Sequence, residues 1–189
     1  MGPRGINGEG GCPAVAGRAR DGWKLALPSS PSTRRAGACI GLKLRRPRPD
    51  QVGALGELLL DAYRGTVDDE GEDLAASMRE ARMYFDGKQG GPAMLADSVV
   101  AWRGDVPVAA CLVAEWTEHR CPFVAFVATR ADSKGAGVGR LLLAVSVRRL
   151  SRAGHREVRA VITRGNRPSE ALFRSLGFEV FERREAPTS

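Results

Sequence analysis

A glycine-rich turn, residues 133–140 with the sequence SKGAGVGR, constrains the fold of this chain more than any other feature. It follows an apolar run, 122–130, which is short and rich in β-branched and aromatic residues, as a buried strand is. After the turn, Val138, Leu141 and Val145 recur at helical spacing. A chain that passes from a strand directly into a helix packs helices against a sheet, so we expect an α/β fold.

Turn signals divide the chain from residue 39 onward into further strands and helices. Gly104-Asp105 marks a hairpin, and Gly154 suits the carboxyl end of a long helix. Three consecutive strand-like runs predict an antiparallel meander. The expected order is βαα-βββ-α-β-α-β, with strands at 40–44, 98–103, 107–116, 122–130, 157–163 and 178–182 and helices at 49–64, 74–87, 137–153 and 168–176.

The first 38 residues differ in composition from the rest of the chain. They are rich in Gly, Pro, Arg and Ser and show no apolar periodicity, so they cannot bury enough surface to offset their ordering entropy. We therefore expect a flexible basic tail over 1–38 and a single domain over 39–189. Arg34-Arg35 precedes Cys39 without the apolar stretch of an export signal, so we expect a cytoplasmic protein.

The net charge of +7 is confined to the amino-terminal region. Residues 1–50 hold ten Lys and Arg against three Asp and Glu, whereas residues 51–189 hold nineteen of each. A neutral body does not predict a nucleic-acid surface, and a short basic tail alone binds phosphates weakly. Charge also interrupts every apolar stretch well before the length of a membrane span. We expect neither nucleic acid nor a membrane as partner.

The cysteines and histidines do not form a metal-binding pattern. Cys12, Cys39, Cys111 and Cys121 are too widely spaced for a zinc knuckle or a C-x-x-C pair, and the chain has two histidines. We therefore expect no metal.

Anion binding is the chemistry that the glycine-rich turn favours. Alternating glycines let successive N–H groups converge, and the helix amino terminus adds about half a positive charge. The G-x-G-x-G spacing fits neither a P-loop nor the dinucleotide fingerprint. A tight turn without a ligand is the alternative interpretation.

Two stretches resemble motifs of the GNAT superfamily of N-acetyltransferases. VATRADSKGAGVGRLLL at 127–143 is similar to the acetyl-coenzyme-A motif [QR]-x-x-G-x-[GA], with Lys134 in the Gln/Arg place. NRPSEALFRSLGF at 166–178 is similar to the second motif, in the family's order and at its separation. The resemblance covers about 40–183 and implies the GNAT fold: an α/β (α+β) protein with a mixed, mostly antiparallel sheet of about six to seven strands and about four helices.

The resemblance implies acetyl-CoA as a co-substrate, without a metal. Amides of the turn would hold the pyrophosphate, the end of the preceding strand would pair with the pantetheine arm, and the Thr129 N–H would polarise the thioester carbonyl. Lys134 supplies positive charge but lacks the planar guanidinium with which arginine binds a phosphate through two parallel hydrogen bonds. The implied coenzyme-binding residues are Val127, Ala128, Thr129, Lys134, Gly135, Ala136, Gly137, Val138, Gly139, Arg140, Asn166, Ser169 and Phe173.

Phe173 departs from the family pattern, because most members have there the tyrosine thought to protonate the leaving thiolate. Phenylalanine has no proton to donate. The chain has two tyrosines, Tyr63 and Tyr84, so a substitute would come from across the acceptor cleft or from water. A thiol with a pKa near 8.5 leaves with limited help, so we expect a reduced rate rather than no reaction.

The sequence leaves undecided which residue is the general base and which residues bind the acceptor. Glu115, Glu118 and His119 are candidate bases, with a solvated turn and a chain of waters as the alternative. Tyr63, Asp69 and Glu70 are the candidate acceptor-binding residues. The acidic loop 68–73 either attracts a cationic amine or is a solvated loop at a helix amino terminus.

The function that follows is acetyl transfer from acetyl-CoA to a primary amine by direct attack in a ternary complex. The acceptor is a small-molecule amine or a protein or peptide amine, and the family also allows a homodimer. The alternative is a degenerate acyl-CoA sensor or interaction module, which the missing tyrosine permits.

Overall fold

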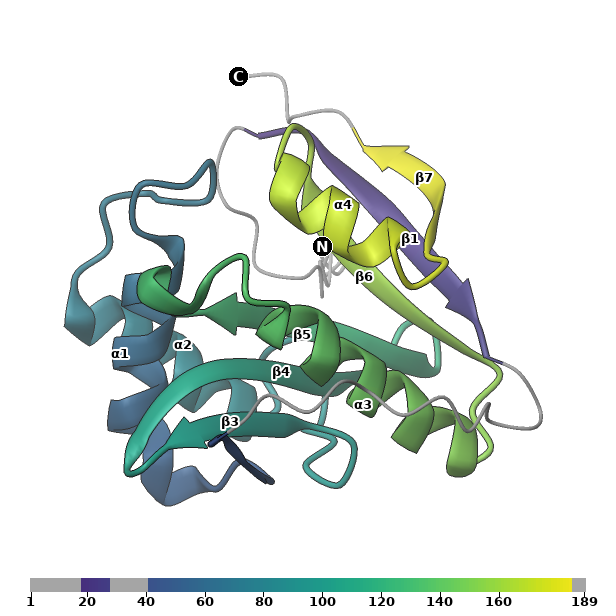
Figure 1. Ribbon diagram of the computed structural model, residues 1–189. Coiled ribbons are helices and arrows are strands. Elements are labelled where there is room, and N and C mark those ends of the chain that lie inside the picture. The colour runs from purple at the N-terminus through teal and green to yellow at the C-terminus, as the bar shows by residue number, and fades with distance from the viewer. Residues whose placement is uncertain (1–17, 28–40, 185–189) are drawn as a thin grey trace, which may run out of the picture.

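The computed structural model describes residues 18–27 and 41–184, which form a seven-stranded sheet with helices on both faces (Figure 1). The helices are α1 Val52–Tyr63, α2 Leu74–Phe85, α3 Val138–Arg152 and α4 Arg167–Arg174, with 3-10 turns at Pro49–Gln51 and Ala131–Ser133. The strands are β1 Arg20–Ala26, β2 Lys43–Arg45, β3 Val99–Arg103, β4 Val106–Trp116, β5 Cys121–Thr129, β6 Glu157–Thr163 and β7 Glu179–Arg184.

The strand order is β2-β3-β4-β5-β6-β1-β7, and β5–β6 is the parallel pair among otherwise antiparallel neighbours. This confirms the expected mixed, mostly antiparallel sheet, including the meander of β3, β4 and β5. From β2 onward, the element order is the expected one. The strand expected at 40–44 is observed as Lys43–Arg45, and Ile40 lies outside the described residues. Within the described part of the chain, no helix is long and apolar enough to cross a membrane.

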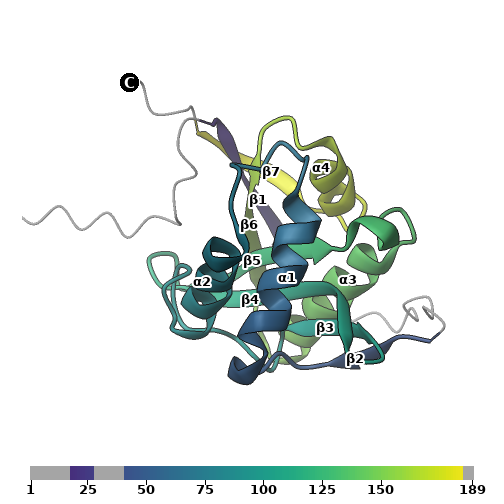
Figure 2. The same ribbon diagram turned by 90° about the vertical axis from the view of Figure 1, so that its left-hand side faces the viewer.

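The sheet separates two apolar layers, as the period of two in its strands requires. Val100 and Leu112 face α1 and α2, whereas Val99 and Val113 face the side of α3 and α4. Figures 1 and 2 show α1 and α2 packed together beside the sheet. Their close approach depends on Gly56, because a Cβ there would lie 2.5 Å from the Met78 Cγ.

The strands β5 and β6 part after a short contact, which opens the sheet at its centre. Their pairing is limited to Phe123 with Arg159 and Val124 with Ala160. Beyond Val124, β5 keeps β4 as its partner but has no described strand on its other side. Figure 1 shows the two strands diverging there. The open edge of β5 therefore leads directly to the glycine-rich turn.

The strand β1 corrects the expectation of a flexible tail over 1–38. Arg20–Ala26 pairs with both β6 and β7, and Trp23 is 1% exposed in the core beneath α3 and α4. The strand was missed because its seven residues, RDGWKLA, carry little apolar periodicity, and both its partners come from the other end of the chain. The rest of the expected tail, 1–17 and 28–38, lies outside the described residues.

Candidate active site

The turn between β5 and α3 presents its backbone to an open space. Gly135 and Gly137 have φ angles of 79° and 77°, which residues with a side chain rarely adopt. Leu141 donates its N–H to the Gly137 carbonyl (3.0 Å), so the amides that precede Leu141 in the first turn of α3 have no intrahelical acceptor. A Cβ on Gly137 would meet no described atom within 4 Å. These are the features of an anion site at a helix amino terminus.

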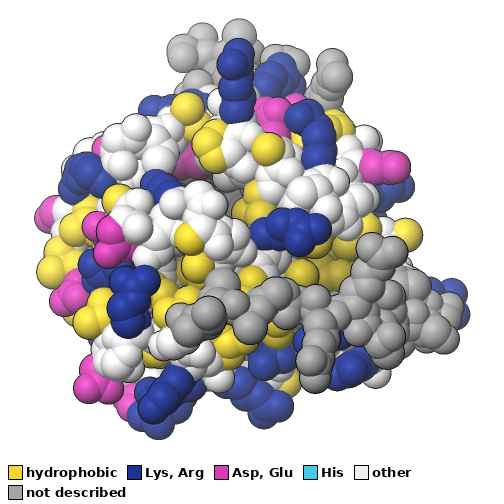
Figure 3. Space-filling view, in the orientation of Figure 1, with side chains coloured by type: hydrophobic (Ala, Val, Ile, Leu, Met, Phe, Trp, Pro, Cys, Tyr) yellow, Lys and Arg dark blue, Asp and Glu magenta, His cyan; other side chains and the backbone are white. Residues whose placement is uncertain are grey.

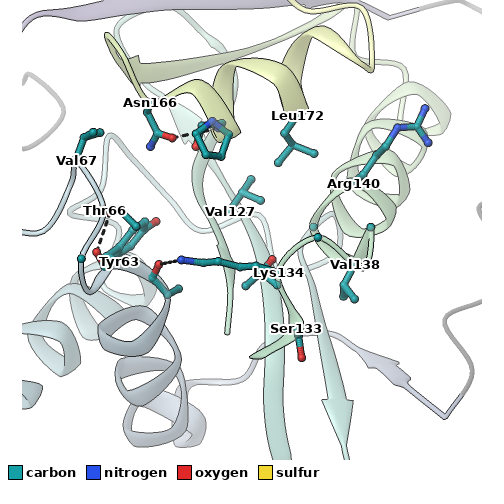
Figure 4. A pocket seen from close by; sticks show the side chains of 18 residues that line it. Tyr63, Thr66, Val67, Val127, Ser133, Lys134, Val138, Arg140, Asn166 and Leu172 are labelled. Atoms are coloured by element: carbon teal, nitrogen blue, oxygen red, sulfur yellow. Dashed lines mark hydrogen bonds between the residues drawn. The ribbon is translucent and has the colours of Figure 1, made fainter. Parts of the chain in front are cut away.

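A cavity of about 710 Å³ opens at this turn, between the ends of α1 and β5 and the amino termini of α3 and α4 (Figure 4). Figure 3 shows the face of the molecule seen in Figure 1, where Lys and Arg side chains stand among apolar ones. The cavity is lined by Ala62, Tyr63, Gly65, Thr66, Val67, Val127, Thr129, Ser133, Lys134, Gly135, Gly137, Val138, Gly139, Arg140, Pro168, Asn166, Ser169 and Leu172.

The two basic side chains of this cavity are held by the protein itself. The Lys134 Nζ donates to the Ala62 carbonyl at the end of α1 (2.6 Å), so the side chain extends from the turn to α1 (Figure 4). The Arg140 Nε donates to the Ser175 Oγ at the end of α4 (3.1 Å). Both contacts tie the turn to neighbouring helices and keep two positive charges at the cavity.

The start of α4 is joined to the acidic loop by one side chain. The Asn166 Oδ1 caps the helix by accepting from the Ser169 N–H (3.1 Å), and its Nδ2 donates to the Asp68 carboxylate (2.6 Å). Because Asn166 bonds on both sides, the loop after α1 and the amino terminus of α4 are held at a fixed separation.

A second cavity, of about 160 Å³, adjoins the first. The two share Tyr63, Val127, Asn166 and Ser169, which therefore lie where the cavities adjoin and are called their shared wall. The residues that line only the second cavity are Arg20, Asp68, Glu72, Glu80, Gln89, Val124, Ala125, Phe126, Val161, Ile162, Thr163 and Phe173.

The second cavity is acidic, and its charges perturb one another. Burial raises the pKa of the Glu80 carboxyl, Glu72 and Glu70 raise it further, and Arg20 opposes the rise. Burial also raises the pKa of the Tyr63 phenol, with further contributions from Asp68 and Glu80. The phenol therefore keeps its proton throughout the physiological pH range.

Most of the residues that the coenzyme motif implied lie around the first cavity. Ala128 and Ala136 line neither cavity: Ala128 is 1% exposed against α1 and α2, and Ala136 is exposed. Phe173 lines the second cavity and packs edge-on against Phe178, with ring centroids 4.9 Å apart. The ring is 4% exposed, so it serves the core as well as the cavity wall.

The three candidate bases lie elsewhere. Glu115, Glu118 and His119 are exposed at the β4–β5 hairpin and line neither cavity. His119 packs edge-on against Trp116, with ring centroids 4.3 Å apart. They occupy the end of β5 opposite the glycine-rich turn, because β5 runs from this hairpin to the turn.

The candidate acceptor residues divide between the cavity and the loop interior. Tyr63 lines both cavities, whereas Asp69 and Glu70 line neither. The Asp69 carboxylate accepts from the Gly65 and Gly71 N–H groups (2.6 and 3.0 Å), so it shapes the loop. Its sequence neighbours Asp68 and Glu72 line the second cavity instead.

Sequence reasoning missed several residues of the second cavity. Asp68 and Glu72 belong to the acidic loop, so its charge was the available signal, but the loop's conformation selects which carboxylates face inward. Arg20, Glu80 and Gln89 carried no comparable signal, because they come from β1, α2 and the segment that follows α2.

The residues present fit a coenzyme that carries a pyrophosphate and an amide-containing arm. Open amides and two positive charges lie at the α3 end of the first cavity, and the unpaired edge of β5 runs away from it. The open space above Gly137 leaves room for a phosphate against the backbone.

Comparison with known proteins gives a family and a set of folds. Residues 53–178, two thirds of the chain, match the Acetyltransferase (GNAT) family. No curated protein matches the sequence. A GCN5-related N-acetyltransferase from Sphaerobacter thermophilus is 19% identical with a TM-score of 0.65, and the match covers 89% of this chain and 50% of that one. This chain thus spans about half the length of that protein.

Two further structures show the same fold. A tandem GNAT protein of the clavulanic acid biosynthesis pathway is 17% identical with a TM-score of 0.65, over 92% of this chain and 55% of that one. The putative acetyltransferase yncA from Salmonella typhimurium, solved with its cofactor acetyl-CoA, is 21% identical with a TM-score of 0.56, over 75% of this chain and 81% of that one. With the family match over two thirds of its length, the chain belongs to the GNAT family of acetyltransferases.

Proposed function

We propose that this protein is an N-acetyltransferase that transfers the acetyl group of acetyl-CoA to a primary amine by direct attack in a ternary complex. One observation carries the proposal: a cavity suited to the coenzyme and a smaller acidic cavity share the wall formed by Tyr63, Val127, Asn166 and Ser169. Two ligands that meet at a common wall can react without a covalent enzyme intermediate.

The coenzyme supplies an acetyl thioester, and the chain's own groups orient it. Amides of the first turn of α3 would bind the pyrophosphate, and Lys134 and Arg140 add positive charge beside it. The unpaired edge of β5 would hold the arm as an additional strand does, through main-chain hydrogen bonds. An N–H at the end of this strand, at Thr129, would stabilise the oxygen as negative charge develops on it.

Transfer forms a C–N bond to the acetyl carbon and breaks its C–S bond. The attacking amine is neutral, the proton that its nitrogen loses passes to water, and the sulfur leaves as a thiolate. Phe173 cannot assist the sulfur, but the Tyr63 hydroxyl lies on the shared wall and keeps its proton. Tyr63 would donate a hydrogen bond to the departing sulfur without giving up the proton, because its pKa is raised.

Phe173 favours a second candidate function, a coenzyme-binding sensor without turnover. The two candidates differ in a single measurement on the full chain: release of free thiol from acetyl-CoA with a panel of primary amines, after calorimetric titration of acetyl-CoA. We expect binding and amine-dependent thiol release. Binding without release across the panel would contradict the transferase function, and absence of binding would contradict both.

A further inference from the structure

We propose that the second cavity binds a small aliphatic diamine as the acceptor, with one amine, neutral when it attacks, at the wall shared with the first cavity and the other held as an ammonium between Glu72 and Glu80. This inference rests on the proposed function and names its substrate class. It follows from the placement of charge, a buried amide and the size of the cavity.

The carboxylates of the second cavity differ in their partners. Asp68 bonds to Asn166 and so lies at the shared wall, where its charge already has a partner. Glu72 and Glu80 line the second cavity and not the first, and the Glu72 carboxylate also accepts the Glu70 N–H (3.0 Å). An acceptor that places its reacting nitrogen at the shared wall therefore has its other end beside these two carboxylates.

The balance of charge in the cavity favours a diamine over a monoamine. Three carboxylates, Asp68, Glu72 and Glu80, and one guanidinium, that of Arg20, line it. Partly buried carboxylates need compensating charge. Burial and the neighbouring Glu72 and Glu70 raise the pKa of Glu80, and Arg20 opposes the rise. A monoamine whose nitrogen is neutral when it attacks supplies no positive charge, whereas a diamine keeps one at the acidic end.

Gln89 is an independent indication of a polar ligand. Its side chain is 3% exposed, lines the second cavity and makes no hydrogen bond to any residue that the structure describes. Buried amides almost always have hydrogen-bond partners in folded proteins. An ammonium, which donates three hydrogen bonds, would satisfy the Gln89 carbonyl oxygen together with a carboxylate.

Geometry and size favour a small organic cation over a metal ion or a large ligand. Among the described residues, no three Asp, Glu, His or Cys side chains converge as a metal ion would require, so the negative charges suit separated positive charges on one molecule. The volume of about 160 Å³ lies below the range of about 300–1,000 Å³ typical of pockets for drug-sized ligands. A chain of a few carbons with an amine at each end meets both conditions.

The test compares 1,4-diaminobutane with butylamine, which has the same carbon chain and one amine. We would titrate each into the full chain saturated with coenzyme A and measure the dissociation constants by calorimetry. We expect the diamine to bind at least about 10-fold more tightly, the effect of one hydrogen-bonded charge pair. In the double variant Glu72→Gln/Glu80→Gln, this preference should fall to about 2-fold or less.

A charge-matched control removes two exposed carboxylates outside both cavities, with Glu57→Gln on α1 and Glu179→Gln on β7. It should leave the preference for the diamine unchanged. Equal affinities of the two amines for the unaltered protein would overturn the inference, and this comparison needs no variant to fold. An equal loss of preference in both double variants would overturn it too, since the attraction would then come from overall charge.

Thiol release measured in the same samples tests the proposed function separately. Release with butylamine as readily as with the diamine would support acetyl transfer and contradict the diamine preference. Tight diamine binding without thiol release would support the diamine site and contradict the transferase function.

Discussion

The proposed coenzyme side of this molecule, around the first cavity, and its proposed acceptor side, around the second, are built in different ways. The anion-binding part of the coenzyme side is continuous in sequence, because β5, the glycine-rich turn and the start of α3 follow one another within residues 121–140, and the end of α1 and the start of α4 complete the cavity. The acceptor side is assembled from β1, the loop after α1, α2, Gln89, the middle of β5, the carboxyl end of β6 and α4. A continuous site can be recognised from a motif, whereas an assembled site exists only once distant segments have paired.

The largest expected effect concerns β1, on which the acceptor side depends. Trp23→Ala removes a side chain that is 1% exposed in the core, and should lower the free energy of unfolding by about 3–5 kcal/mol. Urea unfolding of the full chain measures this loss. Lys24→Ala, at an exposed position of the same strand, is the control and should cost about 0.5 kcal/mol or less. Similar small effects of both changes would contradict the placement of β1 in the sheet.

The coenzyme side predicts a large effect on binding. Gly137→Glu places a carboxylate at the open space of the turn, and should weaken acetyl-CoA binding by at least about 100-fold in calorimetry through like-charge repulsion. Gly154→Glu is matched, because Gly154 also has a positive φ, 88° against 77°, and no neighbour within 4 Å of its Cβ position, but lies after the far end of α3. The two variants share the backbone strain, so equal acetyl-CoA affinities would remove the site from this turn.

Two tyrosines allow a hydroxyl proposed to act in the reaction, that of Tyr63, to be compared with a hydroxyl buried in the core, that of Tyr84. Tyr63→Phe should lower kcat about 10- to 100-fold, through loss of a hydrogen bond to the leaving sulfur, with acetyl-CoA affinity and stability nearly unchanged. Tyr84→Phe should show the opposite pattern, because the Tyr84 hydroxyl is buried and bonds the Ser98 Oγ (2.8 Å) and the Val113 carbonyl (3.1 Å). It should cost about 1–3 kcal/mol of stability and leave kcat unchanged. Stopped assays and thermal unfolding of both variants measure these effects, and an unchanged kcat in Tyr63→Phe would exclude the role of that hydroxyl.

The smallest expected effect is that of Lys134→Ala. The ammonium already bonds the Ala62 carbonyl, so it contributes charge near the cavity rather than a dedicated phosphate contact. Acetyl-CoA binding should weaken about 3- to 10-fold at low salt and less at high salt, because salt screens an exposed charge. Titrations at two ionic strengths measure this, and a loss independent of salt would indicate a structural role for the bond to α1.

The grouping of residues around the first cavity could be predicted from the sequence because the signals are local. Glycine spacing, the apolar run of β5 and the helical period after residue 138 all act within about twenty residues, and the structure places Gly137, Gly139 and Lys134 around one cavity. The candidate bases at 115–119 show the limit of this reasoning. These polar residues at the β4–β5 hairpin suggested a reactive site. The cavity lies instead at the other end of β5, because β5 and β6 separate there.

By itself, the sequence determined the family, the order of elements from β2 onward and the glycine-rich turn between β5 and α3, since these follow from spacing along the chain. Only the tertiary structure decided that Arg20–Ala26 is a strand between β6 and β7, and that Asp68, Glu72 and Glu80 face one cavity while Asp69 and Glu70 do not. The physical reason is that a short strand gains its hydrogen bonds and burial from partners distant in sequence. Likewise, the direction of a loop side chain follows from the hydrogen bonds that fold the loop, such as those of Asp69 to Gly65 and Gly71.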